Sequence, residues 1–447
     1  MPPPRKPHSS RENKADPAIE AGTRVEALIA RVAGDLDDSA RLLAWAKVDA
    51  PATLRALTAA IVAVEARTLA RARGLEVEGA KLLRFFDRAI DPLLARRLID
   101  HAGGIATPAA TLVGTTIDDV EALGRARESL LDLQLVVGDR RVTIEPTAHR
   151  RRSGAHYTPA PLALRIVDET LSPWFGSASR SIEKTSTVRV CDPAMGSGVF
   201  LLATLRWLVA HAPEISPAAH ARATLSGVDL DPLAVEVARW TLAIEARDLS
   251  LLEDLDASLI VGDALADATL GTKTFDAIVG NPPWVSFAGR AAQPIEPSER
   301  IALKRRFQAF HGYPSLHGVF VERAAELLAS HGRLGLLVPS SMSELDKYAP
   351  ARRALDRRCA CDEALDDLGD GPFEGVFQPC MILLATRRES PRDPPSDAAW
   401  PIARADLDAI DRAILAKLDR PPLPPALFGE RGLQSEGDDA AHWRVVP

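Results

Sequence analysis

The chain has 447 residues, of which 46% are hydrophobic and 26% charged, and its formal net charge is −7. This composition is ordinary for a soluble globular protein of roughly two or three domains, and no apolar run approaches the ~20 residues that a membrane span needs. Because the net charge is negative, a nucleic-acid partner would have to bind a local basic surface. The four cysteines form no Cys-x-x-Cys pair typical of a zinc site, so we expect reduced thiols in a cytoplasmic protein.

The first third of the chain is predicted to be mostly helical. Residues 1–20 are rich in proline and charge and lack the apolar core of a secretory signal, so we expect a disordered tail. Over residues 21–148, apolar residues recur at three- and four-residue spacing, which predicts a helical N-terminal domain. A small hairpin near its end is expected to turn at Gly138 and Asp139.

Apolar strands alternate with helical patterns over residues 149–390, the predicted catalytic domain. Strands are expected at residues 187–191, 225–229, 258–261, 275–279, 333–338 and 380–385. This alternation predicts an α/β fold with a mostly parallel sheet covered by helices on both faces. Ligands bind such sheets at the carboxyl ends of the strands. Residues 391–447 are rich in proline and aspartate and are expected to form a linker and part of a C-terminal segment.

The stretch VCDPAMGSGVF, residues 190–200, places an acid and two glycines where the first of these strands ends. Asp192 follows the strand, and Gly196 and Gly198 lead into a helix whose N-terminus favours negative groups. No lysine follows, so the bend is not a Walker loop, and the third glycine of a dinucleotide fingerprint is missing. Taken alone, the bend is explained equally well by a structural turn.

Two further strands of the predicted sheet also end in an acid. Asp229 follows the second strand, where a carboxylate can accept hydrogen bonds from a ribose diol. Asp229 or Asp231 can equally cap the next helix, and we assign capping to Asp231 and ligand binding to Asp229. Asp263 follows the third strand, where it can accept a hydrogen bond from the exocyclic amine of adenine. Three consecutive strands that end in acids favour a ligand site.

The fourth strand ends in Asn-Pro-Pro-Trp, residues 281–284. The two prolines make the backbone rigid and leave it only carbonyl oxygens to offer. The Asn281 side-chain oxygen and the Pro282 carbonyl can both accept hydrogen bonds from a planar amine, which favours a nitrogen with its lone pair available for attack. Trp284 can stack on the ring that carries the amine. A tight turn with a core tryptophan is the alternative for this motif alone.

Together, these segments resemble, in their order along the chain, the gamma-type adenine-N6 DNA methyltransferases of restriction-modification and phage-defence systems. The motifs that carry the resemblance are GAHYTP (154–159), DPAMGSGVFL (192–201), GVDLDP (227–232), GDAL (262–265) and NPPW (281–284). The resemblance implies a Rossmann-like sheet of S-adenosylmethionine-dependent methyltransferases beside the helical N-terminal domain. The chain departs from the family at Met195, usually a cysteine or a small residue, and at Trp284, more commonly Tyr or Phe.

The resemblance implies S-adenosylmethionine as the cofactor and requires no metal. The cofactor-binding residues that it implies are Tyr157, Thr158, Pro159, Asp192, Ala194, Gly196, Gly198, Asp229 and Asp263. Asn281, Pro282, Pro283 and Trp284 would hold the target adenine, which must leave the duplex to reach them. Because the sulfonium methyl is already activated, alignment of the reacting atoms supplies most of the rate.

Basic residues near these motifs are candidate contacts with the phosphates of double-stranded DNA, although each can equally belong to a solvated helix face. These residues are Arg150, Arg151, Arg152, Arg300, Lys304, Arg305 and Arg306, with a further group at Arg352, Arg353, Arg357 and Arg358. We expect residues 288–315 to be mobile without DNA and to close over the flipped base.

The segments that flank the motifs bear on specificity. No convincing nuclease motif precedes residue 150, and the chain ends soon after the point where such methyltransferases usually carry a target-recognition domain. We therefore expect the protein to methylate without cutting. We also expect a separate specificity or defence-system subunit to supply the base readout.

Two other functions fit parts of the pattern. Methyltransferases that act on a protein glutamine or on an RNA base amine have similar loops, but they usually lack the GAHYTP segment and the long loop after residue 284. A non-catalytic DNA-binding subunit is the other alternative, against which the intact Asn281, Pro282 and Asp192 argue. Methyl transfer from labelled cofactor to DNA, RNA or protein separates these functions.

Overall fold

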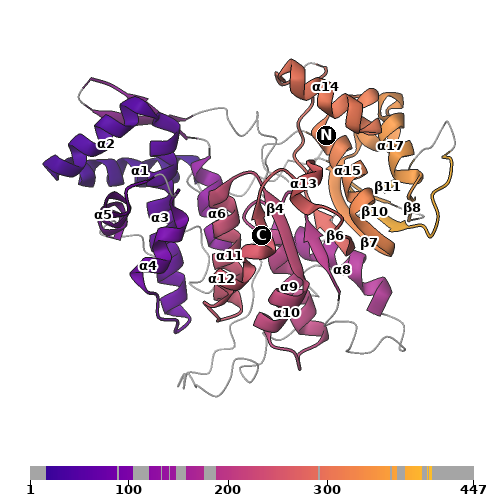
Figure 1. Ribbon diagram of the computed structural model, residues 1–447, viewed down its shortest axis with the longest axis horizontal. Coiled ribbons are helices and arrows are strands. Elements are labelled where there is room, and N and C mark those ends of the chain that lie inside the picture. Colours follow the sequence, from indigo (N-terminus) through magenta and orange to yellow (C-terminus); the bar gives the residue numbers. More distant parts are fainter. Residues whose placement is uncertain are drawn as a thin grey trace, which may run out of the picture.

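The computed structural model consists of a helical region beside an α/β sheet (Figure 1). The residues that it describes are 17–87, 90–103, 120–131, 133–139, 141–146, 158–175, 188–289, 292–362, 365–369, 378–394, 400 and 402–404. Arg150, Arg151, Arg152 and Tyr157, together with nearly all of the predicted C-terminal segment, lie outside the described residues. None of the described helices is both long and apolar enough to cross a membrane.

The helical region is built around one long buried helix. Its elements are α1 (Pro17–Ala33), α2 (Leu36–Val48), α3 (Ala50–Ala72), α4 (Gly79–Leu82), η1 (Leu83–Phe85), α5 (Pro92–Gly103), α6 (Glu121–Leu130), β1 (Leu133–Val137) and β2 (Val142–Pro146). α1 already begins inside the stretch predicted as a tail. Asp49 caps α3 by accepting a hydrogen bond from the backbone N–H of Ala52 at 2.8 Å. The predicted hairpin is confirmed, because β1 and β2 pair antiparallel.

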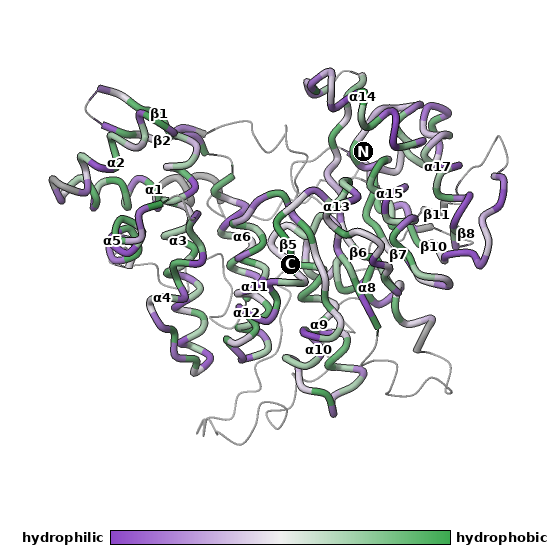
Figure 2. Tube along the Cα trace, in the orientation of Figure 1, coloured by the Kyte–Doolittle hydropathy of each residue, from purple (hydrophilic) through white to green (hydrophobic). Residues whose placement is uncertain are grey.

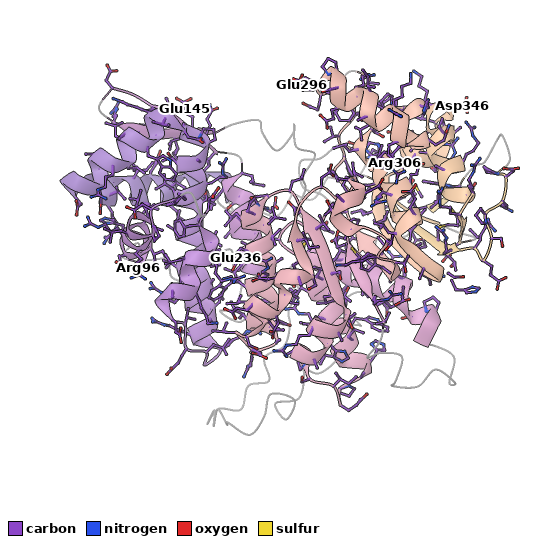
Figure 3. The ribbon with its side chains drawn as sticks, in the orientation of Figure 1. Arg96, Glu145, Glu236, Glu296, Arg306 and Asp346 are labelled. Carbon is purple, nitrogen blue, oxygen red and sulfur yellow. The ribbon has the colours of Figure 1, made fainter. Side chains whose placement is uncertain are left out.

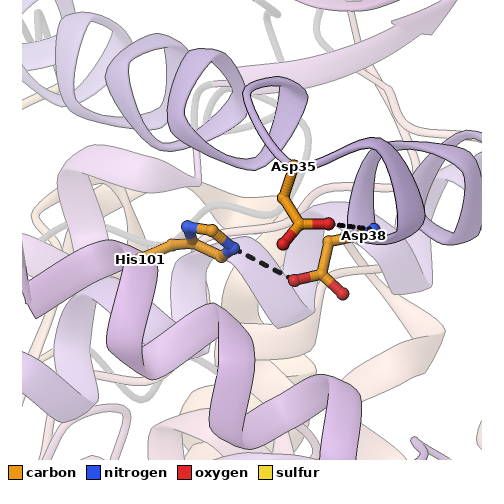
Figure 4. A group of neighbouring side chains, drawn as sticks. All are labelled: Asp35, Asp38 and His101. Carbon is orange, nitrogen blue, oxygen red and sulfur yellow. Dashed lines mark hydrogen bonds and ion pairs between the residues drawn. The ribbon is translucent and has the colours of Figure 1, made fainter.

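One ionic group joins the start of α2 to α5. The buried Asp38 carboxylate accepts a hydrogen bond from Arg97 at 2.8 Å and contacts His101 at 3.1 Å, and Asp35 accepts one from the Asp38 N–H (Figure 4). Burial alone would raise the pKa of Asp38, but the hydrogen bonds from His101 and Arg97 lower it. The group is therefore a satisfied ion-pair cluster that fixes two helices.

A nine-stranded mixed sheet forms the second region, with strand order β11-β9-β10-β7-β6-β3-β4-β5 and β8 paired to β10. The strands are β3 (Val190–Asp192), β4 (Leu225–Asp229), β5 (Leu259–Val261), β6 (Phe275–Gly280), β7 (Leu328–Pro339), β8 (Cys359–Cys361), β9 (Leu365–Gly369), β10 (Cys380–Arg387) and β11 (Ile402–Arg404). The five strands β3 to β7 run parallel to their neighbours, whereas β10 runs antiparallel to β7. The predicted α/β fold and its six strands are thus confirmed.

Helices cover both faces of this sheet. They are α8 (Ala160–Phe175), α9 (Val199–His211), α10 (Pro217–Thr224), α11 (Pro232–Glu245), α12 (Leu251–Asp254), α13 (Asp267–Leu270), α14 (Pro297–Arg306), α15 (Leu316–Leu327), α16 (Ser341–Glu344) and α17 (Ala349–Asp356), with 3₁₀ turns η4 (Leu255–Ala257), η5 (Gln308–His311) and η6 (Asp346–Tyr348). The central strands β6 and β7 are hydrophobic along most of their length (Figure 2), as expected for strands buried on both faces.

The helical region packs on α11 through α3, α6 and η1 (Figure 1). The Phe85 ring stacks on Trp240 of α11 with 5.3 Å between ring centroids. Arg84 pairs with Glu236 at 2.7 Å, and Glu236 lies between the two regions (Figure 3). One hydrophobic cluster runs from α3 into α9 and α11, so the two regions share a core. The domain boundary near residue 148 stays a prediction.

Candidate cofactor and target-base site

The bend after β3 contains a buried acid that lacks one of its partners. Asp192 is 1% exposed, and its Oδ1 accepts a hydrogen bond from the Ala194 N–H at 3.0 Å. Among the described residues, Oδ2 has no hydrogen-bond partner. Burial, reinforced by the nearby Asp229 carboxylate, raises the pKa of Asp192 to about 8. A carboxylate in this setting favours a cationic ligand.

The two glycines of the bend have different structural roles. Both have positive φ angles, +53° at Gly196 and +85° at Gly198, which favour glycine. A Cβ on Gly198 would lie 2.8 Å from the Cβ of Ala238, so this glycine lets α9 pack closely on α11. A Cβ on Gly196 would meet no atom within 4 Å. Gly196 therefore leaves its backbone open to a ligand, whereas Gly198, which the sequence also assigned to cofactor binding, has a packing role.

Asp229 is fixed by backbone hydrogen bonds at the end of β4. Its Oδ2 accepts from the Gly196 N–H and its Oδ1 from the Asp231 N–H, both at 2.9 Å. Each carboxylate oxygen can accept a second hydrogen bond, so Asp229 keeps capacity for a ribose diol. Asp231 accepts from the Leu233 N–H at 2.9 Å and caps α11, as predicted. Asp263, at the end of the neighbouring strand β5, is exposed and accepts from the Leu265 N–H.

The NPPW segment begins against the buried acid of the bend. β6 pairs with β3, and a Cβ added to Gly280 would lie only 2.7 Å from Asp192 Oδ1. Asn281 follows Gly280, and its Nδ2 donates a hydrogen bond to Oγ1 of the buried Thr158 at 3.1 Å. The end of the GAHYTP motif, the acidic bend and the NPPW loop therefore meet at one edge of the sheet. With Nδ2 donating to Thr158, the acceptor end of the Asn281 amide is Oδ1.

Exposure alternates along the four residues of the NPPW motif. Asn281 and Pro283 are partly exposed, whereas Pro282 is buried and Trp284 is 7% exposed. The Trp284 Nε1–H points to the Leu337 carbonyl of β7 at 3.4 Å, and its ring belongs to the core of the sheet. Trp284 thus occupies the core position that was the alternative for this motif, and it supports the loop from the protein side. Its stacking on a base stays a prediction.

The chain after Trp284 is held by a second segment. The Phe287 N–H donates to the Pro314 carbonyl at 2.8 Å, and the Leu316 N–H donates to the Val285 carbonyl at 2.9 Å. The Tyr313 hydroxyl donates to the Ala288 carbonyl at 2.9 Å. Residues 288–315, predicted to be mobile, are therefore anchored at both ends and contain α14 and η5; their closure over a base stays a prediction.

The basic candidates fall into two classes. Lys304 and Arg305 at the end of α14 are exposed. Arg306 pairs instead with Glu326 at 2.6 Å and Asp267 at 3.1 Å, and it is labelled in Figure 3. Arg352 is 4% exposed and donates to the Met342 and Leu345 carbonyls, so its prediction as a DNA contact is wrong. In the described structure, Arg306 is a structural ion-pair residue.

Sequence reasoning missed one residue beside the cofactor bend. Arg127, on α6 of the helical region, is buried and contacts Ser197 and Asp231. No spacing in the sequence indicates that Arg127 contacts residues so far along the chain.

Comparisons with known proteins agree with this geometry. Residues 223–370 match the family described as Eco57I restriction-modification methylase. This match confirms the resemblance that the motifs indicated. The type II methyltransferase M.TthHB8I of Thermus thermophilus is 27% identical over 217 residues, which cover 48% of this chain and 41% of that protein. A tRNA1(Val) (adenine(37)-N6)-methyltransferase of Porphyromonas gingivalis is 28% identical over 138 residues, 31% of this chain and 49% of that protein.

The chain thus spans less than half the length of these curated relatives. Among solved structures, the DrdV–DNA complex has a TM-score of 0.50 and 14% identity, and the similarity covers 89% of this chain and 42% of that chain. At this identity the likeness concerns the fold alone, and it agrees with the α/β fold predicted from the sequence.

Methyltransferases of this family and fold imply S-adenosylmethionine as the cofactor, and the residues of the bend fit it. The buried Asp192 Oδ2 suits the ammonium group of the methionine part. The open space at Gly196 would let a ligand approach the backbone, and the Asp229 carboxylate keeps acceptor capacity that would suit ribose hydroxyls. Tyr157, the remaining motif residue on this side, lies outside the described residues.

Proposed function

We propose that the protein transfers a methyl group from S-adenosylmethionine to the N6 amine of adenine in double-stranded DNA. One observation carries the proposal: Gly280, which precedes the NPPW loop, abuts the buried carboxylate of Asp192. This contact puts the cofactor-binding bend and the amine-binding loop at adjoining strand ends. When bound, the cofactor supplies a methyl group that its sulfonium has already activated for transfer.

On the cofactor side, the chain's own residues bind and orient. Asp192 holds the ammonium group from a buried position, and Asp229 holds the ribose hydroxyls while its own orientation is set by two backbone N–H groups. Asp263 accepts from the adenine amine of the cofactor. Because these groups sit on three adjacent strands, small displacements of one strand end would misalign the methyl group.

On the target side, the NPPW loop binds a neutral amine. The Asn281 Oδ1 and the Pro282 carbonyl oxygen accept hydrogen bonds from the two N–H groups of the amine. These hydrogen bonds disfavour conjugation of the nitrogen lone pair with the adenine ring and leave the lone pair available for attack. The hydrogen bond from Asn281 Nδ2 to Thr158 keeps the amide in the orientation that this task requires. Neither Asn281 nor the prolines can take up a proton, so the proton lost from the nitrogen leaves through water.

The DNA partner and the specificity partner are part of the same proposal. A base inside a duplex cannot reach a site among the carboxyl ends of the central strands, so the adenine must be flipped out. The exposed Lys304 and Arg305 on α14 supply positive charge for phosphates. One relative is named as the methylase subunit of a type I restriction enzyme, which supports a further subunit as the source of base readout.

A second candidate substrate is an adenine in RNA. The similarity to a tRNA adenine-N6 methyltransferase favours it, because the same loop would serve the same amine on another polymer. In both cases the chemistry at Asn281 is unchanged, and only the surface that holds the polymer differs.

The test is methyl transfer from labelled S-adenosylmethionine to duplex DNA, tRNA and a protein extract, followed by digestion to nucleosides. We expect label in N6-methyladenine from DNA with the wild-type protein, alone or with a co-expressed partner from its own gene neighbourhood, and none with Asn281→Ala. Label confined to tRNA would favour the second candidate. Transfer that persists undiminished in Asn281→Ala would contradict the role of the loop.

A further inference from the structure

Arg127 links the helical region to the cofactor bend. It lies on α6, 104 residues before Asp231 in the sequence, and it is 5% exposed. A buried guanidinium is unfavourable unless charged or polar partners compensate for its lost hydration. Apart from Glu128, its neighbour on α6, the partners of this one belong to the loops that form the candidate cofactor site.

The contacts of Arg127 reach both of those loops. Its Nη2 donates to the Asp231 carboxylate, and its Nη1 lies 3.5 Å from the Ser197 hydroxyl and 2.8 Å from Glu128 Oε1. Ser197 stands between the two glycines of the bend, and the Asp231 N–H donates to Asp229. One side chain therefore touches the bend after β3 and the loop after β4.

The charge of Arg127 also acts on the carboxylates of the site. Asp229 is faced by the carboxylates of Asp192 and Asp231, by the Gly196 N–H and by Arg127. Burial raises the pKa of Asp229, and the positive charge of Arg127 opposes that rise. Without this cation, Asp229 would share a buried space with carboxylates of the same sign.

We propose that Arg127 is a positioning residue for cofactor binding, through which the helical region holds residues 196–198 against residues 229–231 and places a positive charge beside Asp229. This inference rests on the cofactor assignment in the proposed function. A purely structural role is the alternative, and Arg84 provides the comparison. Arg84 also joins the helical region to the sheet domain by ion pairs, but its partners are Glu236 within α11 and Asp256, which are not residues of the bend, each at 2.7 Å.

The experiment compares Arg127→Gln, Arg127→Lys and Arg84→Gln in the full chain. The dissociation constant of S-adenosylhomocysteine is measured by titration calorimetry from pH 6 to 9, and unfolding is measured without ligand. We expect Arg127→Gln to weaken binding by about tenfold or more at pH 7. The ratio of variant to wild-type dissociation constants should fall as the pH rises, because Asp229 then ionises without help. Arg84→Gln should lower the unfolding temperature yet leave the affinity within about twofold.

Three outcomes would overturn the inference: wild-type affinity in Arg127→Gln, equal losses in Arg127→Gln and Arg84→Gln, or a loss that does not depend on pH. If Arg127→Gln fails to fold, Arg127→Lys carries the test. Lysine keeps the charge but cannot bridge Ser197 and Asp231 together, so we expect binding about three- to tenfold weaker with the wild-type pH profile. Wild-type affinity in that variant would contradict the inference. A wild-type protein that binds the ligand but methylates no nucleic acid would contradict the proposed function instead, leaving the role of Arg127 intact.

Discussion

At the ends of β3 and β4 the site presents carboxylates, whereas at the end of β6 it presents an amide and proline carbonyls. In the first group, Asp192 is buried and Asp229 is partly buried, and burial together with their like charges raises the pKa of both. In the second group, Asn281, Pro282 and Pro283 carry no titratable side chain. The difference matches the ligands: a cofactor with an ammonium group and a ribose on one side, and a neutral amine on the other. The affinity for the cofactor should therefore depend on pH, whereas the affinity of the NPPW loop for the target base should not.

The largest expected effect distinguishes the NPPW loop, which binds the target base, from the acidic strand ends, which bind the cofactor. Asn281→Ala removes an acceptor for the reacting amine and should lower the rate of methyl transfer about 10²–10³-fold, while cofactor affinity stays within about twofold. Single-turnover transfer to DNA and titration with S-adenosylhomocysteine measure the two quantities. A comparable loss in both would mean that the halves do not act separately.

The next prediction concerns the buried acid. Asp192→Asn removes the partner of the cofactor's ammonium group and should weaken cofactor binding by roughly 10–100-fold. The pKa of this carboxyl is higher in the folded state, about 8, than in the unfolded chain. Its stabilising contribution is therefore complete below about pH 4 and is lost as the pH rises through 8.

In the absence of ligand, Asp192→Asn should consequently gain stability over the wild type as the pH rises, by several kcal/mol between pH 4 and pH 8. At pH 4 the difference should nearly vanish. Denaturant unfolding at pH 4 and pH 8 measures it, and a variant that loses stability relative to wild type between pH 4 and pH 8 would refute the sign.

A third prediction tests the contact between the halves. In Gly280→Ala the new Cβ would approach Asp192 Oδ1 to 2.7 Å. Displacement of the buried carboxylate should reduce the free energy of unfolding by about 1–3 kcal/mol and weaken cofactor binding. Gly79→Ala is the matched control, because a Cβ there meets no atom within 4 Å. Equal behaviour of the two variants in calorimetry would show that Gly280 does not adjoin the acid.

The smallest expected effects concern α14. Lys304→Gln or Arg305→Gln should each reduce the slope of log affinity for DNA against log salt by about 0.9, the value for one phosphate contact. Arg306→Gln should leave that slope unchanged and lower stability by roughly 0.5–1 kcal/mol, since its ion pairs are partly exposed. Binding titrations at several salt concentrations, with thermal unfolding, distinguish the two classes. A slope altered most by Arg306→Gln would reverse the assignment.

The sequence was sufficient for the strands that lie in runs of aliphatic residues, for the acids at their ends and for the cap at Asp231, because these depend on local composition and on residues next to one another. It missed β8, β9 and β11, whose segments contain no consecutive Val, Ile or Leu residues. Lys304 and Arg352 look alike in the sequence, yet one is exposed and the other buried, because burial depends on tertiary packing. For the same reason, the sequence could not decide whether Trp284 lies in the core, and it did not indicate that Arg127 contacts Ser197 and Asp231.

The claim on which everything else depends is that the bend at Asp192 and the loop at Asn281 form one site. The most direct measurement is an experimental structure of the protein with S-adenosylhomocysteine. The account predicts the amino-acid end of the ligand within hydrogen-bond distance of Asp192, the ribose on Asp229 and the sulfur facing Asn281. A ligand bound elsewhere, or one whose sulfur faces away from residues 281–284, would contradict it.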